Sequence, residues 1–298
     1  MSPRLGIAAV QMEYRAWDAD ATLSEFEHLV EQFSKDLPWV DVFVAPELAM
    51  SGFVHFKRAT PDQLEDAVTT VPGPRVDRLA ELARRTRRWL IPGSFWERDG
   101  EEVYNSTVVI SPAGDVVAKY RKMFPWLPAE VGTTPGDSFC VFDIPDVGRI
   151  GVAICYDTWY PEVTRTLAWM GAEIVIRLSL TPTSDRDTEF VLSQANAAFN
   201  QVYFVDVNGL GPWGGGRSAI FDPAGRILQV ASTTPTVLTE ILDVATVRRT
   251  REEGTLGMCQ TWKQLRDSEV EFEMYHDLAK GAIFDGLGPV QRIDTLPD

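Results

Sequence analysis

The sequence predicts an α/β protein with mixed β-sheets and helices on their outer faces. Short runs rich in valine and isoleucine recur along the chain and are bounded by glycine, proline or aspartate, as expected for strands. Amphipathic helical segments lie between some of these runs. Two similar turns, at residues 111–115 and 222–226, place proline and glycine where a tight hairpin needs them. Strands that alternate with helices and hairpins favour this layered arrangement.

The predicted strands are short and are flanked by turn-forming residues. They cover residues 5–12, 41–46, 89–95, 106–110, 116–120, 150–154, 173–178, 202–207, 218–221, 226–230 and 237–242. Helices are expected at residues 21–33, 76–89, 162–170 and 189–199, where apolar side chains recur with helical spacing. No linker divides the chain, and the strong periodicity is lost after Gly254.

Composition and charge exclude several classes of protein. The chain has 298 residues, of which 45% are hydrophobic and 24% charged, so it is expected to be globular rather than disordered. The net charge of −15 disfavours a nucleic-acid partner. The arginines at 84–88 are therefore interpreted as a solvated helix face. No run of about 18 apolar residues and no signal-peptide core are present. We expect no membrane association and a cytoplasmic location.

The sequence also argues against metal and disulfide chemistry. The three cysteines, Cys140, Cys155 and Cys259, form no CxxC motif, and the three histidines share no ligand spacing. We therefore expect no metal site and no disulfide framework. The chemistry that remains available must use cysteine, lysine, aspartate and glutamate side chains.

Cys155 is the candidate nucleophile. It follows a β-run at 151–154 and precedes a helix for which Pro161 suits the first turn. This position places the sulfur beyond the sheet, where the nearby helix N-terminus can favour a thiolate. The alternative is a small buried core residue, which is common for free cysteine. Cys140 is interpreted as core, and Cys259 as inert packing.

Glu47 is the candidate base. It follows the β-run at 41–45 and Pro46, and apolar residues flank it. Partial desolvation at such a strand end would raise the pKa of a carboxyl toward the range useful for a base. A strand-end cap or an ion-pair partner is the alternative for this residue.

Lys122 and Glu130 are the remaining candidates for charged site residues. Lys122 lies just past the β-run at 116–120, in which Lys119 and Arg121 share one face of the pleat if the strand continues. Glu130 follows Lys122 by eight residues, across a segment that two prolines make rigid and non-helical. An exposed charged loop is the alternative interpretation of this segment.

The ordered combination of Glu47, Lys122 and Cys155, each after a β-run, strongly resembles the Glu-Lys-Cys triad of the nitrilase superfamily of carbon–nitrogen hydrolases. The resemblance runs from residue 5 to about residue 242. It includes the motifs Tyr104-Asn-Ser-Thr107, Pro161-Glu162, Gly216-Arg-Ser218 and Asp222-Pro-Ala-Gly225. The segment around Lys122 and Glu130 is similar to that of aliphatic amidases and formamidases.

This resemblance implies a four-layer αββα sandwich that commonly dimerises. With the loss of periodicity after Gly254, we expect a carbon–nitrogen hydrolase domain, residues 1–254, and a C-terminal tail, residues 255–298, that packs on the body or on a partner subunit. A homodimer or higher homo-oligomer, a small amide substrate and no cofactor are implied. The C-terminal extension is shorter than in aliphatic amidases, and the residues around Glu47 differ from theirs.

The resemblance also implies a role for each candidate. Glu47 takes the thiol proton, Cys155 attacks a carbonyl carbon, and Lys122 with the backbone N–H of Tyr156 stabilises the oxyanion. Glu130 helps to position the substrate and Lys122, and its negative charge keeps the ammonium protonated.

The pocket walls are expected to come from aromatic and polar residues on loops after strands, although core packing is the alternative for each aromatic. These residues are Phe53, Trp126, Tyr156, Trp159, Thr181 and Trp213. Cys155-Tyr156-Asp157 resembles amidases and carbamoylases rather than nitrilases, which typically show Cys-Trp-Glu. An amidase is therefore favoured over an N-carbamoyl hydrolase, a nitrilase, a catalytically silent binding subunit or a redox-sensing thiol protein.

Overall fold

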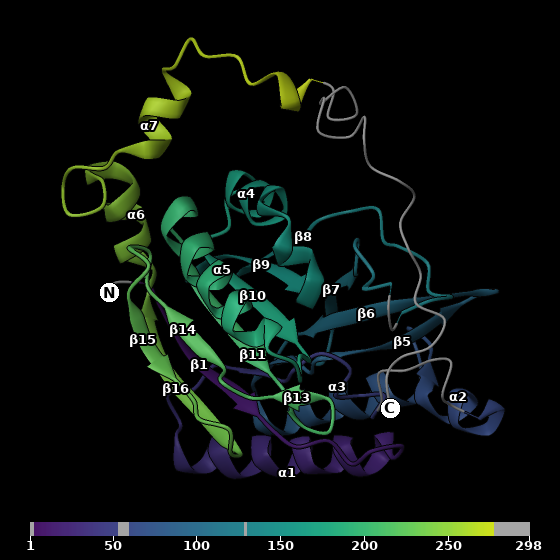
Figure 1. Cartoon of the computed structure of the whole chain (residues 1–298). Coiled ribbons are helices and arrows are strands. Elements are labelled where there is room, and N and C mark those ends of the chain that lie inside the picture. Colours follow the sequence, from purple (N-terminus) through teal and green to yellow (C-terminus); the bar gives the residue numbers. More distant parts are fainter. Residues whose placement is uncertain (1–2, 53–59, 128–129, 277–298) are drawn as a thin grey trace.

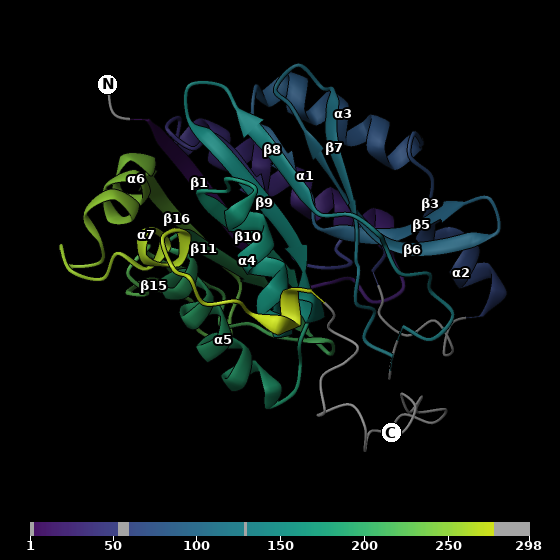
Figure 2. The same cartoon turned by 90° about the horizontal axis from the view of Figure 1, so that it is seen from above.

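The chain folds into four layers, in which two β-sheets pack face to face and helices cover both outer faces (Figures 1 and 2). The structure is a computed structural model, and it describes residues 3–52, 60–127 and 130–276. The layered arrangement confirms the expected αββα sandwich.

The first sheet has eight strands within the described residues. Their order is β16-β1-β2-β4-β6-β5-β3, with β7 also paired to β6. The strands are β1 (Arg4–Gln11), β2 (Val42–Val44), β3 (Val68–Thr69), β4 (Trp89–Ile91), β5 (Ser94–Asp99), β6 (Glu102–Ile110), β7 (Val116–Arg121) and β16 (Thr236–Asp243). The N-terminal strand β1 pairs antiparallel with β16 along its whole length.

The second sheet has six strands in the described part of the chain, in the order β15-β14-β11-β10-β9-β8. These are β8 (Cys140–Ile144), β9 (Gly148–Ile154), β10 (Ile174–Ser179), β11 (Tyr203–Asn208), β14 (Ala219–Phe221) and β15 (Ile227–Val230). Strands β9, β10 and β11 are parallel. A small separate ribbon pairs β12 (Leu210–Gly211) with β13 (Gly214–Gly215).

Two pairs of helices form the outer layers. On the first sheet lie α1 (Ala19–Asp36) and α3 (Pro74–Thr86), and on the second lie α4 (Pro161–Trp169) and α5 (Asp185–Asn200) (Figures 1 and 2). The described residues also include the helices α2 (Pro61–Ala67), α6 (Val244–Glu253) and α7 (Thr261–Arg266) and the short 3₁₀ helices η2 (Cys155–Trp159) and η3 (Glu273–Tyr275).

Each interface between layers has its own apolar core. Aliphatic residues of both sheets, including Val44, Ile154 and Ile176, form one buried cluster between the sheets. A second cluster lies between the first sheet and α1 and α3, and a third lies beneath α4 and α5. Burial of apolar surface on both faces explains why so many strands are nearly continuous apolar runs.

The two predicted hairpin turns are confirmed and are alike in detail. One joins β6 to β7 and the other joins β14 to β15. In the first, Gly114 donates to Ser111 O at 2.8 Å, and in the second, Gly225 donates to Asp222 O at 2.9 Å. Both glycines have a positive φ, at 81° and 77°, which explains why each turn needs glycine there.

Two expected boundaries were wrong for local reasons. The run at 89–95 is two strands, β4 and β5, because the chain turns at Gly93, whose φ is +83°. The helix expected at 76–89 instead ends at Thr86, because Arg87 adopts a left-handed conformation that caps it. Helices α2, α6 and α7 lie where the sequence analysis placed none.

The basic face of α3 is engaged with the protein's own surface. Arg85 forms an ion pair with Glu31 of α1 at 2.7 Å, and Arg84 pairs with Glu81 at 3.2 Å. Arg88 donates to the carbonyl oxygen of Pro38. Arg84 and Arg85 agree with the interpretation of a solvated helix face, whereas Arg87 and Arg88 lie beyond the end of α3.

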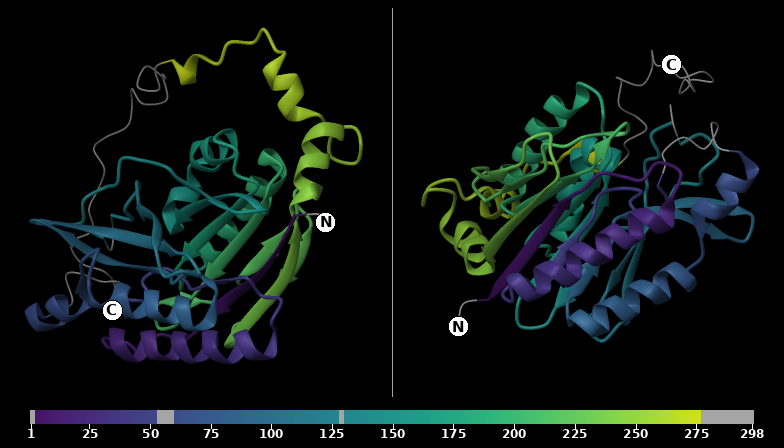
Figure 3. Two further views of the ribbon diagram at one scale, coloured as in Figure 1. Left: turned by 180° about the vertical axis from the view of Figure 1, so that it is seen from behind. Right: turned by 90° about the horizontal axis from the view of Figure 1, so that it is seen from below.

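The chain after α6 extends along the α4 and α5 side of the molecule (Figures 1 and 3). Trp262 of α7 donates to Asn200 O at 3.2 Å, and the Arg165 guanidinium lies 4.6 Å from the centre of its indole ring. This part of the tail therefore packs on the body, while the division of the chain at residue 254 remains a prediction. Within the described ranges, no helix is long and apolar enough to cross a membrane.

Candidate active site

Glu47 lies just after β2, between the two sheets. Its main-chain N–H donates to Ser179 O of β10 at 3.3 Å, and its main-chain carbonyl accepts a hydrogen bond from the Tyr14 hydroxyl. The residue is only 4% exposed. Contacts with β10 and with the segment that follows β1 thus hold the main chain of this buried residue in place.

Lys122 follows the last residue of β7, and its side chain turns into the same buried region. Its Nζ lies 2.8 Å from Glu47 Oε1 and 2.6 Å from Glu130 Oε2. All three side chains are almost completely buried. The alternative of an exposed charged loop is therefore wrong for Lys122 and Glu130. Lys119 and Arg121 do share a face, since both bind Glu97.

Asn105 is a member of this cluster that the sequence analysis did not select. Its Nδ2 donates to Glu47 Oε1 at 2.9 Å and to Glu130 Oε1 at 2.7 Å, and its main-chain carbonyl accepts from the Lys122 N–H. One amide thus spaces the two carboxylates around the ammonium. The available signal was the motif at 104–107, in which a polar residue interrupts a buried β-run.

Cys155 lies at the junction of β9 and η2, with a φ of +47°. Its Sγ is 3.8 Å from Thr181 Oγ1. Removal from bulk water and the nearby Glu47 charge raise the pKa of the Cys155 thiol to about 12, although Lys122 acts in the opposite direction. Burial and Glu47 thus outweigh the groups that favour the thiolate. The thiol is protonated at neutral pH and needs a base.

The pKa values of Glu47 and Lys122 are both raised, which favours the neutral form of the acid and the charged form of the base. Burial, together with the neighbouring Glu130, raises the pKa of Glu47, even though Lys122 lowers it. Burial disfavours the Lys122 ammonium, but the carboxylates of Glu130 and Glu47 outweigh this effect and hold its pKa well above the usual range. Lys122 is therefore a permanent cation, and Glu47 is a carboxyl suited to accept a proton.

Asp157 connects the segment around Cys155 with the segment around Lys122 through hydrogen bonds. One of its oxygens accepts from the Ile154 N–H at 3.0 Å and the Tyr120 hydroxyl at 2.7 Å, and the other accepts from the Phe124 N–H at 2.9 Å. Burial raises its pKa to about 6. This carboxylate links the ends of β7 and β9, which belong to different sheets.

The expected pocket residues divide into several groups. Thr181 adjoins the cysteine sulfur, and the Trp126 N–H donates to Glu130 Oε2 at 2.5 Å. The rings of Tyr156 and Trp159 contact each other with centroids 5.9 Å apart. Trp213 packs against the core beneath α1 and α3. Phe53 lies outside the described residues.

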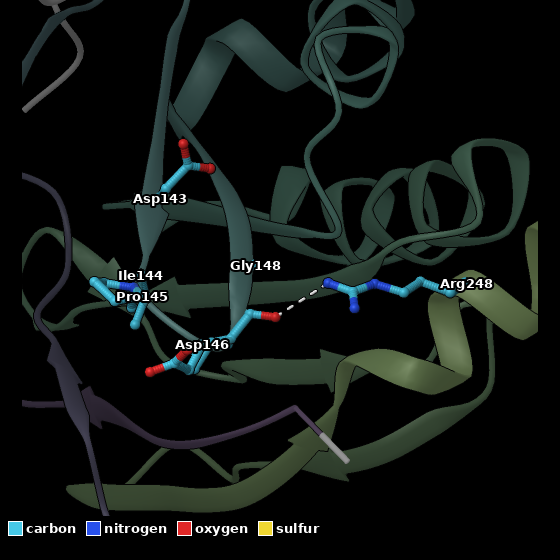
Figure 4. Close-up of a pocket in the computed structure, with 7 residues that line it drawn as sticks. Asp143, Ile144, Pro145, Asp146, Gly148 and Arg248 are labelled. Atoms are coloured by element: carbon cyan, nitrogen blue, oxygen red, sulfur yellow. Dashed lines mark hydrogen bonds between the residues drawn. The ribbon is translucent and has the colours of Figure 1, made fainter. Parts of the chain in front are cut away.

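A separate hollow lies at the turn between β8 and β9 (Figure 4). It has a volume of about 380 Å³ and is lined by residues 143–148 and by Arg248, which donates to Val147 O at 3.2 Å. It contains none of the predicted site residues. Among the described residues, no group of three or more His, Cys, Asp or Glu side chains is arranged to hold a metal ion.

Comparison with known proteins identifies the family. A model described as carbon-nitrogen hydrolase matches residues 6–252. The chain therefore belongs to the carbon–nitrogen hydrolase family.

Individual relatives narrow the comparison. A formamidase from Bacillus cereus strain B4264 is 32% identical over 199 residues, which are 66% of this chain and 58% of the relative. A formamidase from Bacillus anthracis strain A0248 gives the same identity and coverage. The chain thus matches little more than half the length of these formamidases.

Solved structures share the fold. Nit3 from Saccharomyces cerevisiae, a member of branch 10 of the nitrilase superfamily, has a TM-score of 0.76 and 24% identity, and the match covers 85% of this chain and 94% of Nit3. An amidase from Nesterenkonia sp. has a TM-score of 0.71 and 22% identity, with 85% of this chain and 95% of that chain covered. These similarities confirm the nitrilase-superfamily fold expected from the sequence.

Proposed function

We propose that this protein is an amidase that hydrolyses a carboxylic amide to an acid and ammonia through a thioester on Cys155. The observation that carries the proposal is the position of Lys122, whose ammonium lies between the Glu47 and Glu130 carboxylates. An ammonium has three protons, so two are engaged and one remains for a substrate oxygen. The formamidase relatives support a small amide such as formamide.

In the first half-reaction, Glu47 takes the proton of the Cys155 thiol as the sulfur attacks the carbonyl carbon. The negative charge that develops on the carbonyl oxygen is stabilised by Lys122 and the backbone N–H of Tyr156. The C–N bond then breaks, and the proton held by Glu47 goes to the departing nitrogen, which leaves as ammonia. Glu47 is buried and its pKa is raised, so its carboxyl group can hold this proton and then return it.

In the second half-reaction, water attacks the thioester and gives its proton to Glu47. The C–S bond breaks, the acid is released, and the proton returns from Glu47 to the thiolate. Glu130 keeps Lys122 charged and oriented in both steps.

The deciding experiment measures ammonia release from matched series of amides, N-carbamoyl compounds and nitriles. We expect the highest kcat/KM with a small amide. Faster release from an N-carbamoyl compound or a nitrile would replace the proposed reaction with one of these alternatives. No release from any of them would favour a catalytically silent binding subunit.

We further propose that the protein is a cytoplasmic homodimer. Large apolar side chains are exposed on the outer helices, with Trp169 of α4 at 77% and Phe199 of α5 at 63% exposure. Exposed apolar surface of this kind is common where subunits meet. An interface there would brace α4, which follows the Cys155 loop directly.

A further inference from the structure

The peptide that joins Cys155 to Tyr156 is held from one side by two donors. Its carbonyl oxygen accepts hydrogen bonds from Arg177 Nε at 3.2 Å and from Thr158 Oγ1 at 3.1 Å. Cys155 has a φ of +47°, a conformation that costs a non-glycine residue about 1–2 kcal/mol and persists only where the surroundings enforce it. These two donors are part of that enforcement.

Arg177 is itself fixed in place by buried charges. It lies on β10, where it pairs in register with Ala153 of β9, and it is completely buried. Its guanidinium pairs with Glu189 at 2.6 Å and with Asp206 at 3.2 Å. A guanidinium is rigid and planar, so these two contacts fix the direction in which Nε donates.

Because the peptide is planar, a constraint on its carbonyl group also acts on its N–H group. The Cys155–Tyr156 peptide is trans, so its C=O and N–H point in opposite directions. A donor that fixes the carbonyl therefore also fixes the direction of the Tyr156 N–H. Hydrogen bonds to the carbonyl also polarise the peptide and make its N–H a stronger donor.

We propose that Arg177 is a positioning residue that, together with Thr158, orients and strengthens the Tyr156 N–H as an oxyanion donor. The inference rests on the proposed function, in which that N–H stabilises the tetrahedral intermediate. In this proposal neither side chain needs to touch the substrate. Both act through a single peptide plane, from the side opposite to the reacting atoms.

The test compares two reactions of Cys155 that differ in whether an oxyanion forms. Acylation by p-nitrophenyl acetate passes through a tetrahedral oxyanion and releases nitrophenolate. Methyl methanethiosulfonate reacts at sulfur, forms a mixed disulfide and releases methanesulfinate, with no carbonyl oxyanion. Both rates are measured in a Cys259→Ser background, because Cys259 is exposed, and labelling of Cys155 is followed by peptide mass spectrometry.

Thr158→Val removes one donor to the carbonyl with little change of shape, and Thr158→Ser is the matched control that keeps the hydroxyl. We expect Thr158→Val to slow acylation about 10-fold and disulfide formation less than about twofold, with Thr158→Ser near wild type in both. Arg177→Lys keeps the buried charge but loses the planar donor, and it should slow acylation by about 10².

Equal losses in both reactions would overturn the proposal, because they would show that the pair supports the thiol in general. Unchanged acylation in Thr158→Val would also overturn it. If Arg177→Lys does not fold, the two Thr158 variants decide. A wild-type protein that is acylated at Cys155 but releases no ammonia from amides would refute only the proposed function. A wild-type protein that is not acylated would refute this inference as well.

Discussion

At the scale of single residues, the site is organised by one buried cation that two carboxylates share. Lys122 would be costly to bury alone, and so would Glu47 or Glu130. Together with the Asn105 amide they satisfy one another at distances of 2.6–2.9 Å. The cluster has one carboxylate more than cations, which favours proton uptake by Glu47.

The first residue-scale prediction concerns the nucleophile. Cys155→Ala should abolish ammonia release while leaving the melting temperature close to that of the wild type, because the side chain is only half-buried. Cys140→Ser and Cys259→Ser are the controls and should keep turnover. Cys140 is buried, so its serine variant should lose some stability. Turnover retained in Cys155→Ala would remove the nucleophile assignment.

The second prediction separates the role of Glu130 from that of an ordinary buried carboxylate. Glu130→Gln removes one anion from Lys122 and should lower kcat by about 10² or more, because small misplacements of reacting groups are that costly. The thiol should still be alkylated, since Cys155 and Glu47 remain.

Glu97→Gln is the matched control for Glu130. Glu97 of β5 is as buried as Glu130. It binds Lys119 and Arg121 of β7, the strand that precedes Lys122, but the side chains of Lys119 and Arg121 lie away from the site. This variant should lose about 1–3 kcal/mol of stability and little kcat. Near-normal turnover in Glu130→Gln would confine the catalytic group to Glu47, Lys122 and Cys155.

The third prediction concerns pH. The reaction needs Glu47 unprotonated, and its pKa is raised above the ordinary value of about 4.3. Activity should therefore fall as the pH decreases through this raised pKa, so that the acidic limb of kcat/KM lies above pH of about 4.3. Lys122 stays charged because its pKa is well above its usual range, so it adds no limb near neutrality. An acidic limb at or below pH of about 4 would contradict the assignment of Glu47 as the base.

At the scale of elements, the proposed catalytic residues Glu47, Lys122 and Cys155 follow the ends of β2, β7 and β9, so the connections between strands decide the geometry. Gly93, at the break between β4 and β5, has a φ of +83°, and a Cβ there would come within 2.0 Å of Pro46 O. Pro46 directly precedes Glu47. The β4–β5 turn is therefore packed against the backbone that carries the proposed base.

This contact gives an element-scale prediction. Gly93→Ala should cost about 3 kcal/mol or more, from left-handed strain and overpacking combined, and should lower kcat by displacing Glu47. Gly100→Ala is the matched control, because Gly100 also has a positive φ, of 63°, but a Cβ there meets nothing within 4 Å. It should cost about 1 kcal/mol and leave kcat unchanged. Stability is measured by urea unfolding and kcat by turnover. If Gly93→Ala and Gly100→Ala had equal effects on both quantities, the link between this turn and Glu47 would be refuted.

The elements also show what the sequence can and cannot predict. The ordered combination of Glu47, Lys122 and Cys155 predicts the fold through the family that it resembles, and the structure brings Lys122 against Glu47 as that resemblance implies. The break at Gly93 was missed, since apolar residues flank it on both sides. Asn105 and Arg177 were missed because polar residues inside β-runs gain their meaning only from partners far away in the sequence. The high pKa of Cys155 depends on burial, which the local sequence does not reveal.

At the scale of the whole molecule, the asymmetry between the two outer faces is informative. On the first sheet, charged residues of α1 and α3 pair with each other, as Arg85 does with Glu31. On the second sheet, α4 and α5 expose Trp169, Val191 and Phe199. A helix face covered by ion pairs is stable in contact with water, whereas exposed large apolar side chains favour contact with a partner.

This asymmetry leads to the last prediction. The wild type should sediment as a dimer of twice 33.3 kDa at micromolar concentration. Trp169→Glu combined with Phe199→Glu should shift it to the monomer, because two charges would then be buried in an apolar interface. Trp39→Glu, which changes an exposed tryptophan between α1 and β2, is the matched control and should leave the dimer intact. Since α4 follows the Cys155 loop, the monomer should also lose turnover. A monomeric wild type with full activity would contradict both the dimer and its role in bracing the nucleophile.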